Sequence, residues 1–458
     1  LLWTRQFGSL VASEIFRVNP PQNNPESSAS GGPAAVALDL APRSPRYLWM
    51  LIGLLMSVTV FEGYDVTIFH LCTPDIARTF HLDNRAIGTL ASLVRLGGMA
   101  AFVLVMASDR IGRKPIVSGT VLFYTLFTLL TALSSGLGSF TIFQSLAQLF
   151  LSAEFSIAII MVSEEFPDNL RGRGIAALQT VGLFGVVAGG ELYGVVADSR
   201  WGWRGMYFIG VLPLLLVAFL RRGLKETARF EALKAARPPT SAIGEVVAAL
   251  RNALEPIRGP YRGRVLLVAL LWNCVGIVGA PAVTFFALYA KRDHHWSSPQ
   301  VGHAIVLAYV IGALGNIAAG WALDRFGRKP TTGISYVVGA VAILALFQTQ
   351  SHTAILTALV ITVFAFQCAR TATATYSAEL FPTEIRATSY SMTVQLFGQI
   401  ASLLTPFTIG ALSNSVGGLG NAVAIVSIGP VIGALLVWRF APETRGLTLE
   451  QLETRAAD

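Results

Sequence analysis

The octapeptide SDRIGRKP at residues 108–115 returns as LDRFGRKP at residues 323–330. A second pair of segments lies in the same register, since SEEFPDNLRG at 163–172 corresponds to AELFPTEIRA at 378–387. Matching positions in both pairs are 215 residues apart. One such match would be weak evidence, but two matches at one offset indicate that the chain contains an internal duplication.

The composition places this duplicated chain in a membrane. Of its 458 residues, 53% are hydrophobic and only 13% are charged, whereas soluble domains carry about 25% charged residues. The mean hydropathy is +0.60. Apolar runs of about 20 residues, each long enough to cross ~30 Å of hydrocarbon, recur at 47–76, 84–108, 114–134, 138–163, 172–197, 203–221, 264–291, 299–323, 330–349, 352–377, 388–413 and 419–440. The sequence therefore predicts an all-α membrane protein with twelve transmembrane helices in two six-helix halves.

Basic residues predict how the chain lies in the membrane, because Lys and Arg near the ends of spans are retained on the cytoplasmic side. With the amino terminus inside, 26 of the 34 Lys and Arg residues lie on that side and six lie on the other. We therefore expect a multi-pass protein of the cell inner (plasma) membrane with both termini cytoplasmic. The net charge of +8 follows from this topology, so no nucleic-acid partner is needed to explain it.

The spans and the repeat divide the chain into five predicted segments. These are a disordered cytoplasmic segment at 1–45, a six-helix half at 46–221, a cytoplasmic loop at 222–263, a second six-helix half at 264–440 and a cytoplasmic tail at 441–458. The first segment is rich in Pro, Ser, Asn and Gly, a composition typical of disorder.

The sequence gives no sign of an enzyme, a metal site or a cofactor. The three cysteines have no paired spacing, and none of the five lysines is followed by Ser or Thr, which excludes the phosphate-binding motif G-x-x-x-x-G-K-[ST]. No loop is long enough for a catalytic domain. We expect a protein that functions as a monomer in the lipid bilayer, without ATP as a direct fuel and without a cofactor.

The repeated octapeptides make physical sense at the inner ends of spans. Glycine permits a tight turn there, and the basic residues lie among headgroups, where they can pair with neighbouring acids. We interpret these groups as latches whose ion pairs form or break as the two halves rock; a role in topology and folding alone is the alternative. The predicted gating residues are Asp109, Arg110, Arg113, Glu164, Arg171, Asp324, Arg325, Arg328, Glu379 and Arg386.

These motifs make the chain, over about residues 47–450, similar to the major facilitator superfamily of transporters. That family carries G-x-x-x-D-R/K-x-G-R-R/K between the second and third helices of each half. The second copy matches it completely from Gly320 to Lys329, whereas Val105 replaces the first glycine in the first copy. The resemblance implies transport by alternating access.

Further segments resemble the metabolite:proton symporters within that superfamily, which include transporters of sialic acid, oxoglutarate, shikimate and betaines. These segments are EGYD, SLVRLGG, SAEFS and RWGWRGMYFIGVLP. The resemblance places Asp65, Arg95 and Glu154 at the acid of helix 1, the arginine of helix 2 and the glutamate of helix 4. Glu62 stands where some relatives, including aromatic-acid symporters, have Asp. Glu191 lies outside the pattern.

Ionisable groups away from the span ends are candidates for function, because a charge inside the membrane costs several kcal/mol unless it is paired or wetted. Arg95, Glu154 and Arg370 are expected near mid-membrane, and Glu62 and Asp65 share one face of helix 1. We therefore expect charges from both halves to converge where a cavity between the halves would lie. The full set is Glu62, Asp65, His70, Arg95, Glu154, Glu191, His303 and Arg370.

Asp65, with Glu62 as second candidate, is the predicted proton-coupling residue, and Arg95, Arg370, Glu154 and Tyr64 are the predicted substrate-binding residues. A substrate carboxylate on Arg95 would remove the counter-ion of Asp65, which would then take up a proton. The alternatives are structural: in them Asp65 and Arg95 pair only with each other, and Glu154 serves only to organise Arg95. A lone histidine such as His70 usually marks a satisfied polar contact.

We therefore expect a secondary active transporter that imports a small organic anion, specifically a carboxylate, together with protons. The alternatives are a proton-driven exporter, a facilitator of neutral or zwitterionic metabolites, and a non-transporting membrane sensor on the same fold. The acids and bases at mid-depth favour transport, because a scaffold has no reason to bear their cost.

Overall fold

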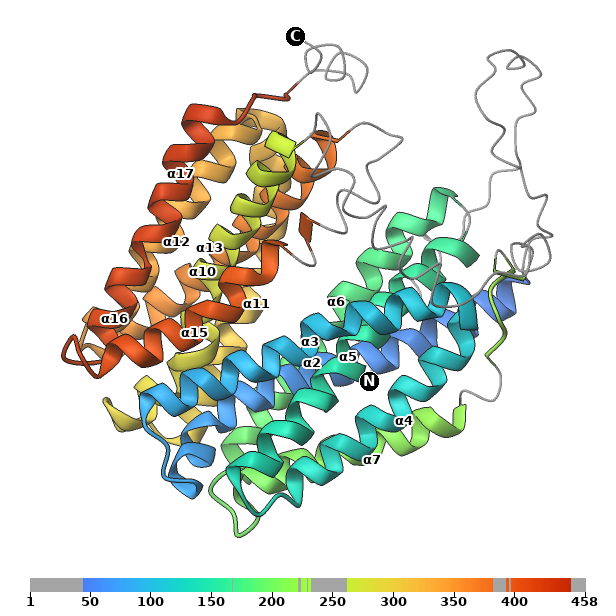
Figure 1. The fold of residues 1–458 in the computed structure, drawn as a ribbon, viewed down its shortest axis with the longest axis horizontal. Coiled ribbons are helices and arrows are strands. Elements are labelled where there is room, and N and C mark those ends of the chain that lie inside the picture. Colours follow the sequence, from blue (N-terminus) through green and yellow to red (C-terminus); the bar gives the residue numbers. More distant parts are fainter. Residues whose placement is uncertain are drawn as a thin grey trace, which may run out of the picture.

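The computed structural model describes residues 44–166, 168–220, 224–228, 230–231, 262–381, 393–394 and 397–445. The predicted disordered segment, most of the central loop and most of the carboxyl-terminal tail lie outside these residues. Figure 1 shows the described part as two helical bundles.

Each bundle contains six membrane helices, as the duplication predicts. The amino-terminal half consists of α2 (Pro45–Thr79), α3 (Asn84–Ile111), α4 (Arg113–Ala132), α5 (Leu137–Glu165), α6 (Asp168–Val196) and α7 (Gly202–Leu220). The carboxyl-terminal half consists of α10 (Arg262–Arg292), α11 (Ser298–Phe326), α12 (Arg328–Gln348), α13 (His352–Glu379), a 3-10 turn η2 (Phe397–Gln399) that leads into α15 (Ile400–Ser413), and α16 (Leu419–Val426) followed by α17 (Ile428–Phe440). The predicted all-α fold is confirmed.

Local chemistry explains where several helices begin. Ser44 accepts a hydrogen bond from the Tyr47 N–H at the start of α2, and Asp83 accepts one from Ala86 at the start of α3. Ser297 and Gln300 form a reciprocal capping box before α11. Each cap satisfies a backbone donor that the first helical turn leaves open.

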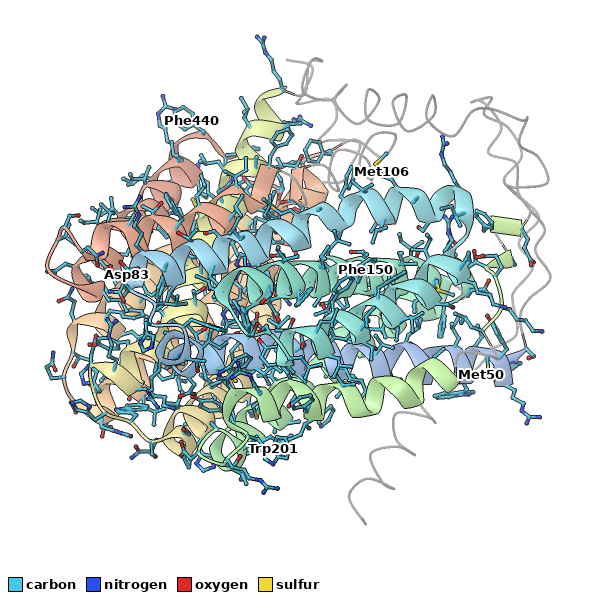
Figure 2. All side chains as sticks on the ribbon, turned by 60° about the horizontal axis from the view of Figure 1, so that its bottom comes forward. Met50, Asp83, Met106, Phe150, Trp201 and Phe440 are labelled. Atoms are coloured by element: carbon cyan, nitrogen blue, oxygen red, sulfur yellow. The ribbon has the colours of Figure 1, made fainter. Side chains whose placement is uncertain are left out.

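The lateral surface suits a lipid environment. In the described residues, ten helices are long and apolar enough to cross a membrane. Large apolar side chains stand outward on them, such as Val103, Val195 and Ile317, which are 65%, 76% and 72% exposed. In Figure 2, Met50 near the start of α2 and Asp83 just before α3 lie at opposite ends of the helices.

The twelfth span is broken, which the apolar pattern did not predict. The run 419–440 reads as one helix, but the structure divides it at Ser427 into α16 and α17. Pro430 has no N–H to bond back to the preceding turn, and its ring crowds that turn, so a helix tends to break just before it. The first part of the predicted eleventh span, before residue 393, lies outside the described residues.

The two halves meet at one end of the molecule. We call this end, with the turns 80–83 and 293–297, the far end, and the opposite end, with the turns at Gly112 and Gly327, the motif end. A Cβ on Gly88 would approach the Pro406 carbonyl oxygen to 2.2 Å, and one on Gly302 would approach that of Gly190 to 2.1 Å. Figure 1 shows the bundles converging near α3 and α15 and diverging toward the motif end. Glycine thus permits close helix crossing at the far end.

Candidate functional site

Three predicted charged residues lie at one level between the halves. Glu62 on α2 is within electrostatic range of Glu154 on α5 and Arg370 on α13. Counted from the far-end termini of these helices at ~1.5 Å per residue, all three lie roughly 26 Å along. The level therefore contains acids from the amino-terminal half and a base from the carboxyl-terminal half.

Asp65 and Arg95 lie deep in the protein with unused hydrogen-bonding atoms. Asp65 is 1% exposed. The Tyr124 hydroxyl on α4 lies near it, but neither carboxylate oxygen forms a well-aligned hydrogen bond with a described residue. The buried Nε of Arg95 likewise lacks one there. The direct Asp65–Arg95 ion pair considered from the sequence is therefore not formed in this conformation. Buried polar atoms without partners are costly, which marks both side chains as candidates for binding a proton or a ligand.

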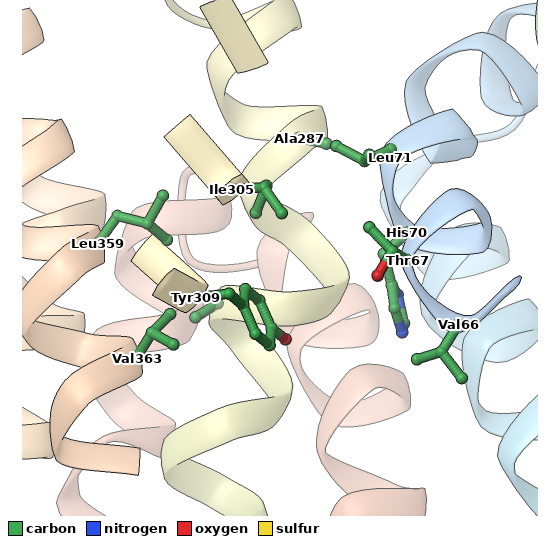
Figure 3. A pocket seen from close by; sticks show the side chains of 10 residues that line it. Val66, Thr67, His70, Leu71, Ala287, Ile305, Tyr309, Leu359 and Val363 are labelled. Carbon is green, nitrogen blue, oxygen red and sulfur yellow. The ribbon is translucent and has the colours of Figure 1, made fainter. Parts of the chain in front are cut away.

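Arg95 belongs to a second level, nearer the far end. It is within electrostatic range of Tyr309 on α11 and of His70 on α2. His70 and Tyr309 line a pocket whose walls come from α2, α10, α11 and α13, and so from both halves. Figure 3 shows His70 on one wall and Tyr309 extending toward it from the other.

The rest of this pocket is mainly apolar. Its wall includes Val66, Leu71, Ile305, Leu359 and Val363. Its cavity volume is about 30 Å³ in this conformation, well below the ~300–1,000 Å³ usual for ligand sites, so the walls from the two halves have to separate before a ligand enters. An apolar pocket beside a guanidinium suits a ligand that has an apolar body and an anionic end.

Tyr64, predicted to contact substrate, lies in the packing of the amino-terminal half. Its side chain is 4% exposed, and its hydroxyl donates to the Met206 carbonyl at 2.8 Å. We therefore leave Tyr64 out of the site. Glu191, which the sequence left without a role, lies 3.3 Å from Nε2 of His303 across the contact of α6 with α11.

At the motif end of the first half, Arg113 forms a bidentate ion pair with Glu164. The two hydrogen bonds measure 3.1 and 2.8 Å, and the same arginine donates to the Ser108 carbonyl at 3.0 Å. Thr227 donates to Glu164 at 2.7 Å, and Glu226 accepts from the Arg113 backbone N–H at 2.9 Å. The Glu164 carboxylate thus joins Arg113, at the α4 N-terminus, to Thr227 in the segment after α7.

The second half repeats this arrangement. Arg328 pairs with Glu379 at 2.7 Å, Thr444 donates to Glu379 at 2.5 Å, and Glu443 accepts from the backbone N–H groups of Arg328 and Lys329 at 2.9 and 3.1 Å. Each cluster joins elements within one half. The sequence interpretation was that these ion pairs form or break as the two halves rock. Their gating role remains a prediction.

Two of the remaining predicted gating residues, Asp324 and Arg325, are exposed at the motif end. Asp324 is 84% exposed and lies 3.9 Å from Arg328. The side chains of Asp109 and Arg171, and the whole of Arg386, lie outside the part that the structure describes.

The sequence analysis missed Glu226 and Glu443. A signal exists, because KET at 225–227 and PET at 442–444 both follow the last span of a half. Their offset is 217 residues rather than 215, so they fall out of the register of the other motifs. Burial raises the pKa of Glu443, but hydrogen bonds from the backbone N–H groups of Arg328, Arg445, Lys329 and Thr444 outweigh it and hold the pKa below its ordinary value.

Replacing Gly327 by Ala tests this cluster. Gly327 has φ 105°, and a Cβ there would lie 2.7 Å from a Glu443 carboxylate oxygen. The methyl group would strain the turn and displace Glu443, which we expect to cost ~1–3 kcal/mol. The midpoint of thermal unfolding in detergent should fall. Gly320→Ala is the matched control, because a Cβ there meets nothing within 4 Å; equal midpoints for the two variants would contradict a stabilising cluster.

A charged network that sequence reasoning also missed joins the halves at the far end. Lys291 of α10 donates to both carboxylate oxygens of Asp75 of α2, at 3.0 and 3.2 Å. It also donates to Tyr193 and Ser298, each at 3.0 Å. The Lys291 and Asp75 side chains are only 10% and 12% exposed. The two halves are therefore held together by a largely buried ion pair.

Comparison with known proteins identifies the family. The model of the family described as "Sugar (and other) transporter" matches residues 62–456. The chain belongs to the sugar (and other) transporter family. It is thus a multi-pass membrane transporter of the major facilitator type and not an enzyme, which confirms the predicted resemblance. In the described residues, no group of three His, Cys, Asp or Glu side chains is placed to hold a metal ion.

Relatives of this transporter include carriers named for hydroxylated aromatic acids. The 4-hydroxybenzoate transporter PcaK of Pseudomonas putida is 26% identical over 78% of this chain and 84% of its own length. The gentisate transporter of Corynebacterium glutamicum is 27% identical over 78% of this chain and 81% of its own. The gallate transporter of Pseudomonas putida is 26% identical over 85% of this chain and 91% of its own.

Solved structures share the fold. A D-xylose-proton symporter superposes with a TM-score of 0.73 at 19% identity, covering 88% of this chain and all of that one. A bacterial homologue of the human lysosomal transporter Spinster gives a TM-score of 0.69 at 19% identity, covering 86% of this chain and 97% of that one.

Proposed function

We propose that this transporter imports an aromatic carboxylate, of the hydroxybenzoate kind, together with a proton. The observation that carries the proposal is that Arg95 lies near an apolar pocket. The buried Nε of Arg95 has no hydrogen-bond partner in the described residues. The names of three relatives support the substrate class, because 4-hydroxybenzoate, gentisate and gallate each combine a carboxylate with an aromatic ring.

In this proposal the substrate carboxylate binds the Arg95 guanidinium, and its ring enters the apolar pocket when the walls from the two halves move apart, because the cavity of about 30 Å³ is too small for a ring in this conformation. Asp65 carries the proton: an ionised carboxylate that has no aligned donor among the described residues and no ion pair with Arg95 is costly to bury, and a proton relieves that cost. Because Asp65 and Arg95 do not pair in this conformation, substrate binding at Arg95 and proton uptake at Asp65 are coupled through the cavity they share. A permanent Asp65–Arg95 ion pair is not involved. Each proton that moves inward contributes ~2.3 kcal/mol per 100 mV of membrane potential.

We assign the motif end to the cytoplasm, since the basic residues gather there. The structure is then closed outside by the Asp75–Lys291 network and by the glycine crossings. Transport requires the far end to open, so this network has to break once in every cycle. It would act as an outer lock that favours the inward-facing state.

Lys291→Met tests the outer lock. Removing one partner of a buried charge pair costs ~2–5 kcal/mol, so we expect the population to shift toward the outward-facing state by roughly 30-fold or more. Spin labels at Arg200 and Ser351, one on each half, should report a longer distance. Arg78→Met is the matched control, because Arg78 also neighbours Asp75, at 3.9 Å, but belongs to the same half and is 76% exposed. Unchanged distances in Lys291→Met would remove the lock.

Proteoliposome uptake tests the function. Labelled benzoate, 4-hydroxybenzoate, gentisate and gallate are offered with an imposed inward proton gradient, and xylose serves as an unrelated solute. We expect concentrative uptake of at least one aromatic carboxylate, abolished by a protonophore. Uptake only when the imposed proton gradient is directed outward would indicate a proton-driven exporter. Equilibration that does not depend on the gradient would indicate a facilitator, and binding without flux would indicate a sensor.

A further inference from the structure

The apolar pocket contains a polar side chain that the proposed carboxylate–Arg95 contact and proton transfer do not use. His70 lines the pocket, and its Nδ1 is buried without a hydrogen-bond partner in the described part of the chain. The ring is in edge contact with Phe69, at 5.1 Å between centroids. The sequence suggested that His70 is satisfied by a polar neighbour. In this conformation its Nδ1 has no such neighbour among the described residues.

The surroundings of His70 restrict what it can recognise. Besides Tyr309, the wall near His70 offers Thr67 as a polar group, and the Thr67 hydroxyl donates to the Gly63 carbonyl at 2.7 Å. The neighbouring wall residues Val66 and Leu71 are apolar. A ligand group that reaches His70 thus finds one imidazole in a mainly apolar wall. This arrangement can orient a single polar substituent of the ligand.

We infer that His70 is a specificity-determining residue that hydrogen-bonds a ring hydroxyl of the aromatic substrate. The inference rests on the proposed function, which places the carboxylate at Arg95 and the ring in the pocket. A neutral imidazole has one donor and one acceptor nitrogen, and a phenol can satisfy either of them. A site that hydrogen-bonds a substrate hydroxyl discriminates against the analogue without it, because the polar group of the protein is then left unpaired.

Tyr309 has a different position in this arrangement. It lies on the opposite wall, within electrostatic range of both Arg95 and Arg370. That position places its hydroxyl near the carboxylate end of the bound substrate. His70 and Tyr309 should therefore respond differently when a hydroxyl is removed from the ring.

The experiment compares benzoate with 4-hydroxybenzoate and 3-hydroxybenzoate in equilibrium binding to the purified full-length protein, so it is independent of proton coupling. Wild type should bind at least one hydroxybenzoate more tightly than benzoate. In His70→Phe we expect affinity for that hydroxybenzoate to fall about tenfold or more, while benzoate changes within about threefold. His70→Gln, which keeps a donor and an acceptor, should retain part of the preference.

Two further variants separate the possible outcomes. Val66→Phe narrows the pocket and should weaken benzoate and the hydroxybenzoates alike, which checks that the ring binds there. His294→Phe is the matched control, because His294 packs on Tyr289, with ring centroids 4.5 Å apart, and does not line the pocket; it should change nothing.

The possible failures are distinguishable. If wild type binds none of the three benzoates, the proposed function itself fails and takes this inference with it. If wild type binds them and His70→Phe leaves the preference for the hydroxyl unchanged, the role of His70 is wrong and the proposed function stands. A selective loss in Tyr309→Phe instead of His70→Phe would assign the hydroxyl to the opposite wall.

Discussion

Arg95→Ala should abolish substrate binding, with a loss of affinity of about 100-fold or more for benzoate and its hydroxylated relatives. A carboxylate–guanidinium pair in a largely desolvated site loses ~2–5 kcal/mol when one partner is truncated. Without Arg95 the anion would also enter a cavity that contains Glu62, Asp65 and Glu154. Repulsion by any of these acids that is ionised adds to the loss.

Isothermal titration of the purified variant measures this effect. Arg95→Lys keeps the charge but not the planar fork of donors, so it should recover part of the affinity. Arg85→Ala is the matched control, because it removes an exposed arginine from the far-end turn of the same helix. Wild-type affinity in Arg95→Ala, together with a loss in Arg370→Ala, would move the substrate carboxylate to the other half.

The sequence predicted those parts of the fold that depend on local pattern. Apolar run length predicted the spans, and the octapeptide repeat predicted their division into two sets of six. The break at Ser427 was missed because the run 419–440 is apolar throughout, and hydropathy alone does not register that Pro430 lacks an N–H.

The candidate site was less predictable, because its contacts join residues far apart in the chain. Depth counting placed Arg95, Glu154 and Arg370 together near mid-membrane. The structure instead has Glu62 within electrostatic range of Glu154 and Arg370, while Arg95 lies nearer the far end, within range of His70 and Tyr309. Depth counting could not tell which helix faces meet. It therefore placed Asp65 beside Arg95, which do not pair in this conformation, and gave no hint that Lys291 pairs with Asp75, 216 residues away.

Asp65→Asn should separate substrate exchange from uphill transport. The amide imitates the protonated carboxyl in size and charge, so the carrier should still bind substrate and exchange it across the bilayer. No proton can then be taken up or released at this position. We therefore expect concentrative uptake in response to a pH gradient to vanish while counterflow of labelled against unlabelled substrate persists.

Both fluxes can be measured in one proteoliposome preparation, with Glu62→Gln as the matched variant. Glu62 lies one turn earlier on α2, within electrostatic range of Glu154 and Arg370, whereas both oxygens of Asp65 lack a hydrogen-bond partner among the described residues. Glu62 has a cation, Arg370, nearby, although the Glu154 carboxylate offsets its effect, and Asp65 instead has the Tyr124 hydroxyl close to it. We therefore place the proton on Asp65 first and test Glu62 beside it. If Asp65→Asn still concentrates substrate and Glu62→Gln does not, the proton is carried by Glu62, and the orphaned atoms of Asp65 need another explanation.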